Sequence, residues 1–399
     1  MKKLVLFDTV TTGHHVSYAE FIIRYLEKNT TMQWDFVTDT CSPYLRKLLL
    51  LFPRSILDWR SIGRHPIINR IYFSRRISRI FQIMNCIDYS IASQANLIHF
   101  LSIDHMEIPL FLNLLICHCK LQGISCKIIC TVHKEKPKRS RLGRNVARRM
   151  LRYMAARGWI DIVFVHVSAA AKDLRAKGVI ISQIPYPIDN EIMKSALPFS
   201  KKELCDRLGM PITNKPICLL FGSIRPIKGV TYLLQALEHI KIPCLILIAG
   251  KLSPSLGIDL LERSRAFQSE NVELRVVTEY ITNEDIPLYY ALADLILMPY
   301  THDSPGAGGP LLLASAARKP VIASDLGELG RKVRAYNLGI LCEPESVSAL
   351  ANSLNKALSQ IEMLKNNILE GAERCANRHS WHNMARQVYQ SYELIIQSI

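Results

Sequence analysis

Residues 217–237, ICLLFGSIRPIKGVTYLLQAL, show in one stretch how this chain is built. Five apolar residues predict a buried β-strand, and the apolar positions after residue 229 recur at helical spacing. The loop between them, residues 222–229, has a glycine at each end, which lets the backbone turn sharply. A strand, a glycine-containing turn and a helix in this order are typical of a parallel α/β sheet.

Strand-like apolar runs alternate with helical patterns through most of the remaining chain. In the first half we predict strands at residues 3–7, 34–38, 97–100, 127–132 and 162–167, with a further candidate at residues 184–187. In the second half we predict strands at residues 217–221, 244–249, 272–276, 295–298, 321–323 and 339–341. This alternation predicts the α/β class, with two Rossmann-like domains in tandem.

The length of 399 residues exceeds what one hydrophobic core usually serves, so we expect two domains. Pro185 and Pro187 stiffen the exit from the first predicted sheet, and a polar stretch follows them. We predict an N-terminal domain at residues 1–188 and a C-terminal domain at residues 189–378, with a cleft between them. Residues 379–399 should form a helix that crosses back to the N-terminal domain.

The composition is that of a globular protein, with 49% apolar and 21% charged residues. No apolar run approaches the roughly 20 residues that span a bilayer, and Asp8 interrupts the first run, which favours a strand over a signal peptide. The eleven cysteines lack the C-x-x-C spacing of a zinc site. We interpret them as buried free thiols in a reducing, cytoplasmic compartment and expect no metal.

Two loops carry the features of a phosphate site, because open α/β sheets bind ligands beyond the carboxyl ends of their strands. The loop at residues 222–229 holds Arg225 and Lys228, two cations that suit a diphosphate. The loop at residues 299–310, PYTHDSPGAGGP, is rich in glycine and leads to Pro310, a residue favoured at the first turn of a helix. Backbone amides at such a helix start bind anions. The alternatives are a solvated basic loop and a structural turn without a ligand.

These segments resemble the retaining glycosyltransferases of family 4, the glycosyl transferases group 1. Residues 222–229 resemble their Gly-Arg…Lys-Gly diphosphate loop, residues 306–310 their Gly-Phe-Gly-Leu-Pro segment, and residues 318–323 their Gly-x-Pro-Val-Ile-Ala strand. The resemblance is strong from about residue 160 onward and thin before it. It implies the GT-B fold, in which two Rossmann-like domains face each other across a cleft. It also implies transfer of a sugar from a nucleoside-diphosphate sugar without a metal or other cofactor.

The chain departs from the family at two acidic positions. The family carries two glutamates eight positions apart, one contacting the donor sugar and one holding the ribose hydroxyls, and here these positions are Pro305 and Leu313. Neither side chain can accept a hydrogen bond. Substitutes are expected among four polar residues for which simple surface polarity is the alternative: His302, Asp303, Ser304 and Glu328.

The resemblance implies a set of site residues. The donor would be bound by Gly13, Gly222, Arg225, Lys228, Lys251, Ser304, Gly306, Ala307, Gly308 and Gly309. The catalytic residues would be His133, Arg225 and Lys228, because the family often has a histidine facing the donor sugar at the end of the strand that precedes His133. His14 and His15 would contact the acceptor, with ordinary loop histidines as the alternative. His166, inside a predicted strand, is interpreted as packed.

The formal net charge of +16 concentrates in one part of the first domain. Residues 134–157 hold ten basic residues and one acidic residue, with apolar residues at helical spacing, and residues 67–81 show a similar mixture. We favour attachment to an anionic membrane surface, at its cytoplasmic face. The alternative is that the apolar stripes pack on the first sheet. Nucleic acid is not expected, because no nucleic-acid recognition motif accompanies the charge.

We therefore predict a glycosyltransferase of polysaccharide biosynthesis. It would move a sugar from a nucleoside-diphosphate sugar to a hydroxyl acceptor, a lipid-linked or cell-surface glycan. The missing glutamates keep a second hypothesis open, a non-catalytic GT-B protein that binds a sugar nucleotide or a partner glycosyltransferase. A phosphorylase or epimerase on the same fold is disfavoured, because the chain shows no context for a pyridoxal-phosphate lysine.

Overall fold

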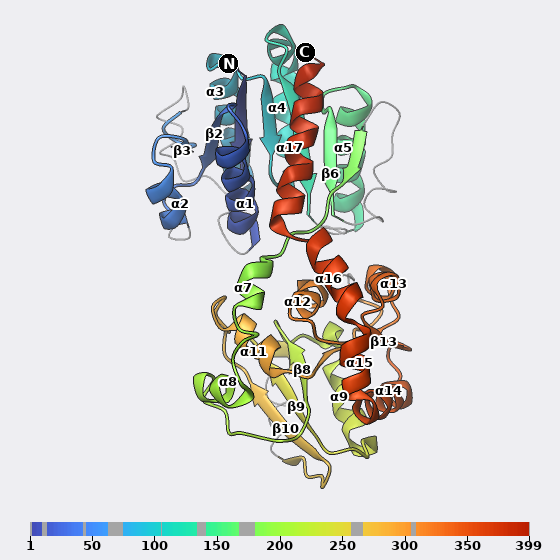
Figure 1. Cartoon of the computed structure of the whole chain (residues 1–399). Helices are drawn as coiled ribbons and strands as arrows, with labels where there is room; N and C mark the ends of the chain where they lie inside the picture. Colours follow the sequence, from blue (N-terminus) through green and yellow to red (C-terminus); the bar gives the residue numbers. More distant parts are fainter. Residues whose placement is uncertain are drawn as a thin grey trace. The chain divides into compact units, whose positions relative to one another are not determined.

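The computed structural model describes residues 2–9, 14–42, 45–62, 75–104, 106–133, 141–166, 180–256, 266–304 and 309–398. The chain forms two compact units (Figure 1). The first unit comprises Met1–Pro187 together with Trp381–Ile399, and the second comprises Ile188–Ser380. No helix among the described residues is long and apolar enough to cross a membrane.

The first unit is built on a parallel sheet with the strand order β3-β2-β1-β4-β5-β6-β7. Its strands are β1 (Lys3–Phe7), β2 (Gln33–Thr38), β3 (Ile56–Asp58), β4 (Leu97–Phe100), β5 (Lys127–Val132), β6 (Ile162–Val165) and β7 (Ile180–Gln183). Its helices are α1 (His14–Asn29), α2 (Arg46–Leu51), α3 (Arg75–Ala92), α4 (Glu107–Gly123), α5 (Arg141–Ala156) and α17 (Trp381–Gln397).

Both faces of the central part of this sheet are buried, which is why β1, β4, β5 and β6 are mostly apolar and do not alternate. Along β1, Val5 and Phe7 enter the core shared with α3, α4 and α5, and Leu4 and Leu6 enter the core shared with α1 and α17. Figure 1 shows α17, drawn in red, beside α1, and these two helices are in contact.

The second unit is also a parallel sheet covered by helices, with the strand order β10-β9-β8-β11-β12-β13. Its strands are β8 (Ile217–Phe221), β9 (Cys244–Ala249), β10 (Val272–Val277), β11 (Leu295–Met298), β12 (Val321–Ser324) and β13 (Gly339–Cys342). Its helices are α7 (Asn190–Lys194), α8 (Lys201–Arg207), η3 (Pro226–Lys228), α9 (Val230–Ala236), η4 (Leu237–His239), η5 (Pro254–Leu256), α11 (Ile286–Leu292), α12 (Gly309–Ala316), α13 (Gly327–Tyr336), α14 (Val347–Ser359), α15 (Ile361–Asn367) and α16 (Leu369–Arg378).

The predicted α/β class with two Rossmann-like sheets is confirmed, but the edge of the first sheet differs from the prediction. Residues 184–187 form no strand, and the edge strand is β7, directly before them. Pro185 and Pro187 have no amide hydrogen for a sheet ladder, so the strand ends ahead of them. The short strand β3 was not predicted. His166 follows β6 instead of lying inside it, and residue 167 is outside the described residues.

Helix α17 is joined to the first sheet by a buried polar chain. The Tyr392 hydroxyl hydrogen-bonds Nδ1 of His99 in β4, and Nε2 of His99 lies 2.8 Å from Oγ1 of Thr131 in β5. Burial lowers the pKa of His99 to about 3, so the imidazole is neutral and can donate through one nitrogen and accept through the other. The last helix of the chain is thus an integral part of the first core.

Replacing Tyr392 with alanine should destabilise the first unit by about 3–5 kcal/mol, because a fully buried ring is lost. Tyr392→Phe keeps the ring and should cost only about 1 kcal/mol. The matched control is Leu394→Ala, on the same helix but 71% exposed, which should have almost no effect. All four tryptophans lie in the first unit, so tryptophan fluorescence during urea unfolding reports this unit selectively. Equal effects of Tyr392→Ala and Leu394→Ala would contradict the packing of α17 in this core.

Candidate functional site

The ends of three neighbouring strands meet in the second unit. In the sheet, β8 lies between β9 and β11, so the chain moves to one side of β8 first and to its other side later. Such a reversal of strand order opens a crevice beyond the carboxyl ends, where α/β proteins bind their ligands. The loops that follow β8, β9 and β11 are therefore the places where a ligand is expected.

Glycines let these three loops pack backbone against backbone. Gly229 has φ +70°, and a Cβ there would stand 1.7 Å from the Pro299 carbonyl oxygen. Gly250 has φ +137°, and a Cβ there would stand 2.1 Å from the Gly222 carbonyl oxygen. The loops are also joined by a hydrogen bond of 3.1 Å from the Thr301 amide to the Ile227 carbonyl. No other residue type fits at either glycine without moving a neighbouring loop.

Lys228 is the most buried cation of this crevice. Its side chain comes from η3, is only 8% exposed, and donates a hydrogen bond of 2.6 Å from Nζ to the Phe221 carbonyl. Burial lowers its pKa to about 8, and the nearby positive charge of Arg225 contributes to the lowering. The ammonium group lies 5.4 Å from the centre of the Tyr300 ring. A bound anion would compensate for the charge that burial disfavours.

Arg225 adds a second cation, three residues earlier in the same loop. Its Nε is buried and has no hydrogen-bond partner in the part of the chain that the structure describes. An unpaired buried donor is costly and is normally satisfied by a ligand or water. Arg225 and Lys228 thus place two cations in one loop, and the diphosphate that the sequence predicts for them stays a prediction.

Only part of the loop after β11 belongs to the described residues of the candidate site. Ser304 is half-buried, and its amide donates to the Thr301 carbonyl at 2.9 Å, whereas His302 and Asp303 are exposed. Residues 305–308, which include the predicted donor contacts Gly306, Ala307 and Gly308, lie outside the described residues. Gly309 is the first residue of α12, and Lys251, after β9, is exposed.

The positions of the two family glutamates gain no obvious replacement in the described structure. Leu313 is half-buried in α12 and Pro305 is outside the described residues. Glu328, one of the proposed substitutes, accepts a hydrogen bond of 2.9 Å from Arg331 Nε and lies 3.9 Å from Lys332 Nζ. Its carboxylate would have to leave both cations before it could hold ribose hydroxyls.

The first unit gathers histidines and tyrosines at the carboxyl ends of its own strands. The His133 ring, after β5, lies 5.2 Å from the His15 ring, 4.8 Å from the Tyr18 ring and 4.9 Å from the His166 ring. His133 Nε2 lies 2.7 Å from the Leu101 carbonyl oxygen. The structure thus brings together His15 and His133, which were predicted as site residues, and places His166, which was predicted to be packed, at 4% exposure beside them.

Sequence reasoning missed Asp8 as a member of this cluster. Asp8 follows β1 directly, and its Oδ2 lies 3.0 Å from Nδ1 of His15 in α1, with both side chains buried. The signal was an acidic residue at the carboxyl end of an apolar strand, next to a predicted site loop. Gly13 lies outside the described residues, and His14 begins α1 with a side chain that is not described.

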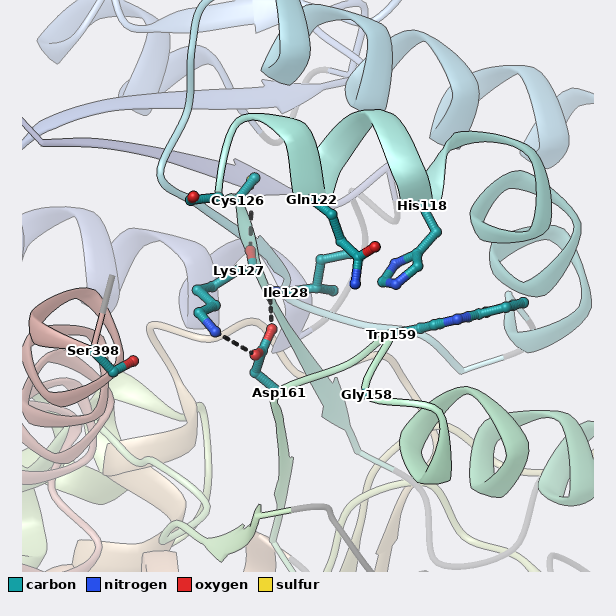
Figure 2. Close-up of a pocket in the computed structure, with 10 residues that line it drawn as sticks. His118, Gln122, Cys126, Lys127, Ile128, Gly158, Trp159, Asp161 and Ser398 are labelled. Carbon is teal, nitrogen blue, oxygen red and sulfur yellow. Dashed lines mark hydrogen bonds and ion pairs between the residues drawn. The ribbon is translucent and has the colours of Figure 1, made fainter.

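Two further groups in the first unit were considered as sites. A cavity of about 340 Å³ opens at the amino ends of β5 and β6, lined by His118, Lys127, Trp159 and Asp161 among others (Figure 2). Figure 2 shows the Lys127–Asp161 ion pair, 3.2 Å long, at its edge. Among the described residues one group, Asp39, Cys41 and Asp58, has the spacing of metal ligands. The Arg60 guanidinium already pairs with both of its carboxylates. All eleven cysteines are free thiols, and nine of them are buried.

The close packing of the loops predicts an unequal response to two glycine substitutions. Gly229→Ala should destabilise the second unit by at least about 2 kcal/mol more than Gly209→Ala, because only the first creates a clash with backbone. Gly209 is a matched control, since its φ is +60° and a Cβ there has nothing within 4 Å. The measurement is urea unfolding followed by circular dichroism, with tryptophan fluorescence identifying the transition of the first unit. Similar losses in the two variants would mean that the loops do not approach as described.

Part of the chain is similar to a known protein family. Residues 215–360 match the protein family described as glycosyl transferases group 1. A 2-deoxystreptamine glucosyltransferase from Streptomyces kanamyceticus is 25% identical over 230 residues, 57% of each chain. A D-inositol 3-phosphate glycosyltransferase from Corynebacterium urealyticum is 30% identical over 195 residues, 46% of this chain and 44% of that protein. The chain thus spans about half the length of the curated relatives it matches.

Solved structures resemble the whole chain in fold. A glycosyltransferase from Rickettsia africae ESF-5 has a TM-score of 0.74 at 16% identity, covering 100% of this chain and 99% of that one. A sucrose-phosphate synthase from Thermosynechococcus elongatus has a TM-score of 0.70 at 18% identity, covering both chains completely. Anabaena Alr3699/HepE in complex with UDP and glucose has a TM-score of 0.67 at 15% identity, covering 98% of this chain and 100% of that one. At these identities the likeness shows a common fold.

Proposed function

We propose that this chain transfers a sugar from a nucleoside-diphosphate sugar to a hydroxyl acceptor, on the basis of the GT-B fold and of the match of residues 215–360 to the glycosyl transferases group 1. One observation carries the proposal: a buried lysine and an arginine with an unpaired buried Nε stand together at the strand-order reversal of the second sheet. The acceptor class we propose is a lipid-linked or cell-surface glycan, as in polysaccharide biosynthesis.

In this proposal the diphosphate of the donor binds Lys228 and Arg225. The bond between the anomeric carbon and the diphosphate oxygen breaks, and the negative charge on the departing nucleoside diphosphate increases. Cations already fixed in a buried site stabilise that charge without reorganising, which lowers the barrier to transfer. Further donor contacts are proposed for Gly13, Gly222, Lys251, Ser304 and the segment 306–309.

The first unit would supply the acceptor side of the reaction. His15, held by the carboxylate of Asp8, is proposed to contact the acceptor hydroxyl together with His14, and His133 is proposed to face the donor sugar. A carboxylate that accepts a hydrogen bond from one ring nitrogen fixes the orientation of the other nitrogen. The acceptor oxygen bonds to the anomeric carbon and its proton is taken up by a base. Retention of configuration is proposed from the family resemblance.

A second candidate function follows from the missing glutamates. Leu313 in α12 supplies no carboxylate for the ribose, and the Glu328 carboxylate is engaged by Arg331. In this second proposal the chain is a non-catalytic GT-B protein that binds a sugar nucleotide or a partner glycosyltransferase. Turnover of the nucleotide sugar with a supplied acceptor distinguishes the two functions, because only an enzyme releases nucleoside diphosphate.

Lys228→Ala should abolish detectable nucleotide binding. A panel of nucleoside diphosphates and their sugars is tested by thermal unfolding, where a ligand at 100 times its dissociation constant stabilises by about 2.7 kcal/mol. The control variant is Lys241→Ala, an exposed lysine of the same unit, which should keep the full shift. If Lys228→Ala binds a nucleotide as well as the unaltered protein does, the diphosphate site is assigned wrongly.

Affinity for the nucleoside diphosphate should fall as the pH rises above about 8. The pKa of Lys228 is about 8 without a ligand, so above this pH the free protein loses the proton that the bound state needs. Well above this pKa the dissociation constant should rise about tenfold per pH unit until the pKa of the bound state is reached. In Lys228→Arg the side chain stays charged, so the slope should vanish. Titration calorimetry from pH 7 to pH 9.5 makes the comparison, and an equal slope in both proteins would exclude Lys228 as its origin.

A further inference from the structure

Helix α4 is apolar on its outer side as well as on its inner side. The inner side enters the first core through Leu110, Leu114, Cys117 and Leu121. On the outer side Leu112, Leu115 and Ile116 are 39%, 58% and 76% exposed. We call these three residues the α4 crest. A helix on the surface of a globular protein normally carries polar residues there, so the crest is an apolar surface that the described chain leaves uncovered.

The neighbouring helix α5 extends this surface. Tyr153 of α5 is exposed, and its ring lies 5.9 Å from the Phe111 ring of α4 and 5.7 Å from the Trp159 ring. Exposed Val146 lies on the same helix. Tyrosine and tryptophan combine an apolar ring with a polar group and are enriched where proteins meet the boundary between lipid and water.

The apolar stripe expected in residues 134–157 contributes differently from the prediction. Leu151 and Met154 are buried in the first core, so this part of the stripe packs on the sheet, as the alternative interpretation held. Residues 134–140 lie outside the described residues. The exposed apolar surface is thus supplied mainly by α4, which the sequence reasoning did not single out.

Basic residues outnumber acidic residues around the crest. Residues 141–157 contain six arginines and no acidic residue, and α4 carries one lysine and one acidic residue, the buried Glu107. The acidic neighbours of α4 are Asp88, near Cys117, and Asp161, near His118. Arg149 and Arg152 of α5 are exposed. Basic side chains beside an inserted apolar surface are attracted by anionic lipid headgroups, each contributing about a fivefold gain in binding.

We propose that the α4 crest inserts into the headgroup region of an anionic membrane, with Arg149 and Arg152 of α5 against the lipid phosphates. A second copy of the chain fits this surface poorly, because two faces rich in arginine would repel each other. A nucleic acid fits it poorly as well, because the centre of the surface is aliphatic. The inference goes beyond the proposed transfer reaction and does not depend on it.

The test is sedimentation of the full chain with vesicles of phosphatidylcholine, with or without phosphatidylglycerol. The chain should bind the anionic vesicles, and Ile116→Glu should weaken that binding at least about tenfold, because a carboxylate replaces an inserted side chain. Leu394→Glu is the matched control: the same change on α17, at 71% exposure compared with 76%, should alter binding less than about twofold.

A second pair of variants tests the charge. Arg149→Gln should weaken binding to anionic vesicles about fivefold and leave binding to neutral vesicles unchanged. Arg386→Gln, at an arginine of α17 that is also exposed, should have no effect. Tryptophan fluorescence during urea unfolding, measured in each variant, shows that the first unit is intact, because all four tryptophans lie in it.

Three outcomes would overturn the inference. The unaltered chain could fail to bind anionic vesicles, or Leu394→Glu could weaken binding as much as Ile116→Glu. Light scattering could also show a dimer that Ile116→Glu dissociates, which would make a second copy the occupant of the crest. The Lys228→Ala variant, which should lose nucleotide binding, should still bind anionic vesicles as the unaltered chain does. Failure of this inference and failure of the proposed function can therefore be told apart.

Discussion

The candidate site of the second unit depends on the contact between the loop after β8 and the loops after β9 and β11. The backbones of these loops approach so closely that no side chain fits between them. Gly229 against Pro299 and Gly250 against Gly222 set the width of the crevice. That width in turn buries Lys228 against the carbonyl of Phe221. A wider spacing would admit water around the ammonium group and weaken its interaction with any phosphate. The close approach that the two glycines allow thus strengthens the electrostatic interaction between Lys228 and a bound phosphate.

In the first unit, the sheet topology brings the histidine cluster together from distant parts of the chain. Asp8, His133 and His166 follow three different strands, and His15 lies in the first turn of α1. They meet because parallel strands β1, β5 and β6 release their carboxyl ends at one edge of the sheet. A site made in this way tolerates change in the intervening sequence, which agrees with the thin resemblance of this half to the family.

The difference between the two units explains what could be predicted from the sequence. The loop holding Arg225 and Lys228 follows its strand within a few residues, so pattern and chemistry appear together in one short stretch. The unpaired Nε of Arg225, the Asp8–His15 contact and the position of Tyr18 depend on three-dimensional packing and leave no local pattern. The exposure of the outer face of α4 was not predicted for another reason. A helix that is apolar on all sides is expected to be fully buried, and only the three-dimensional structure shows which side its neighbours cover.

The chain order of α17 has a consequence for how the protein is made. The first unit begins at Met1 and is completed by Trp381–Ile399, with all of Ile188–Ser380 placed between these parts. During synthesis the second unit leaves the ribosome whole and can fold by itself. The first unit has to wait with Ile22, Phe36 and Phe164 incompletely covered until Met384, Val388 and Tyr392 are translated. The nascent amino-terminal half therefore exposes apolar core residues for as long as the second unit and α17 are being translated.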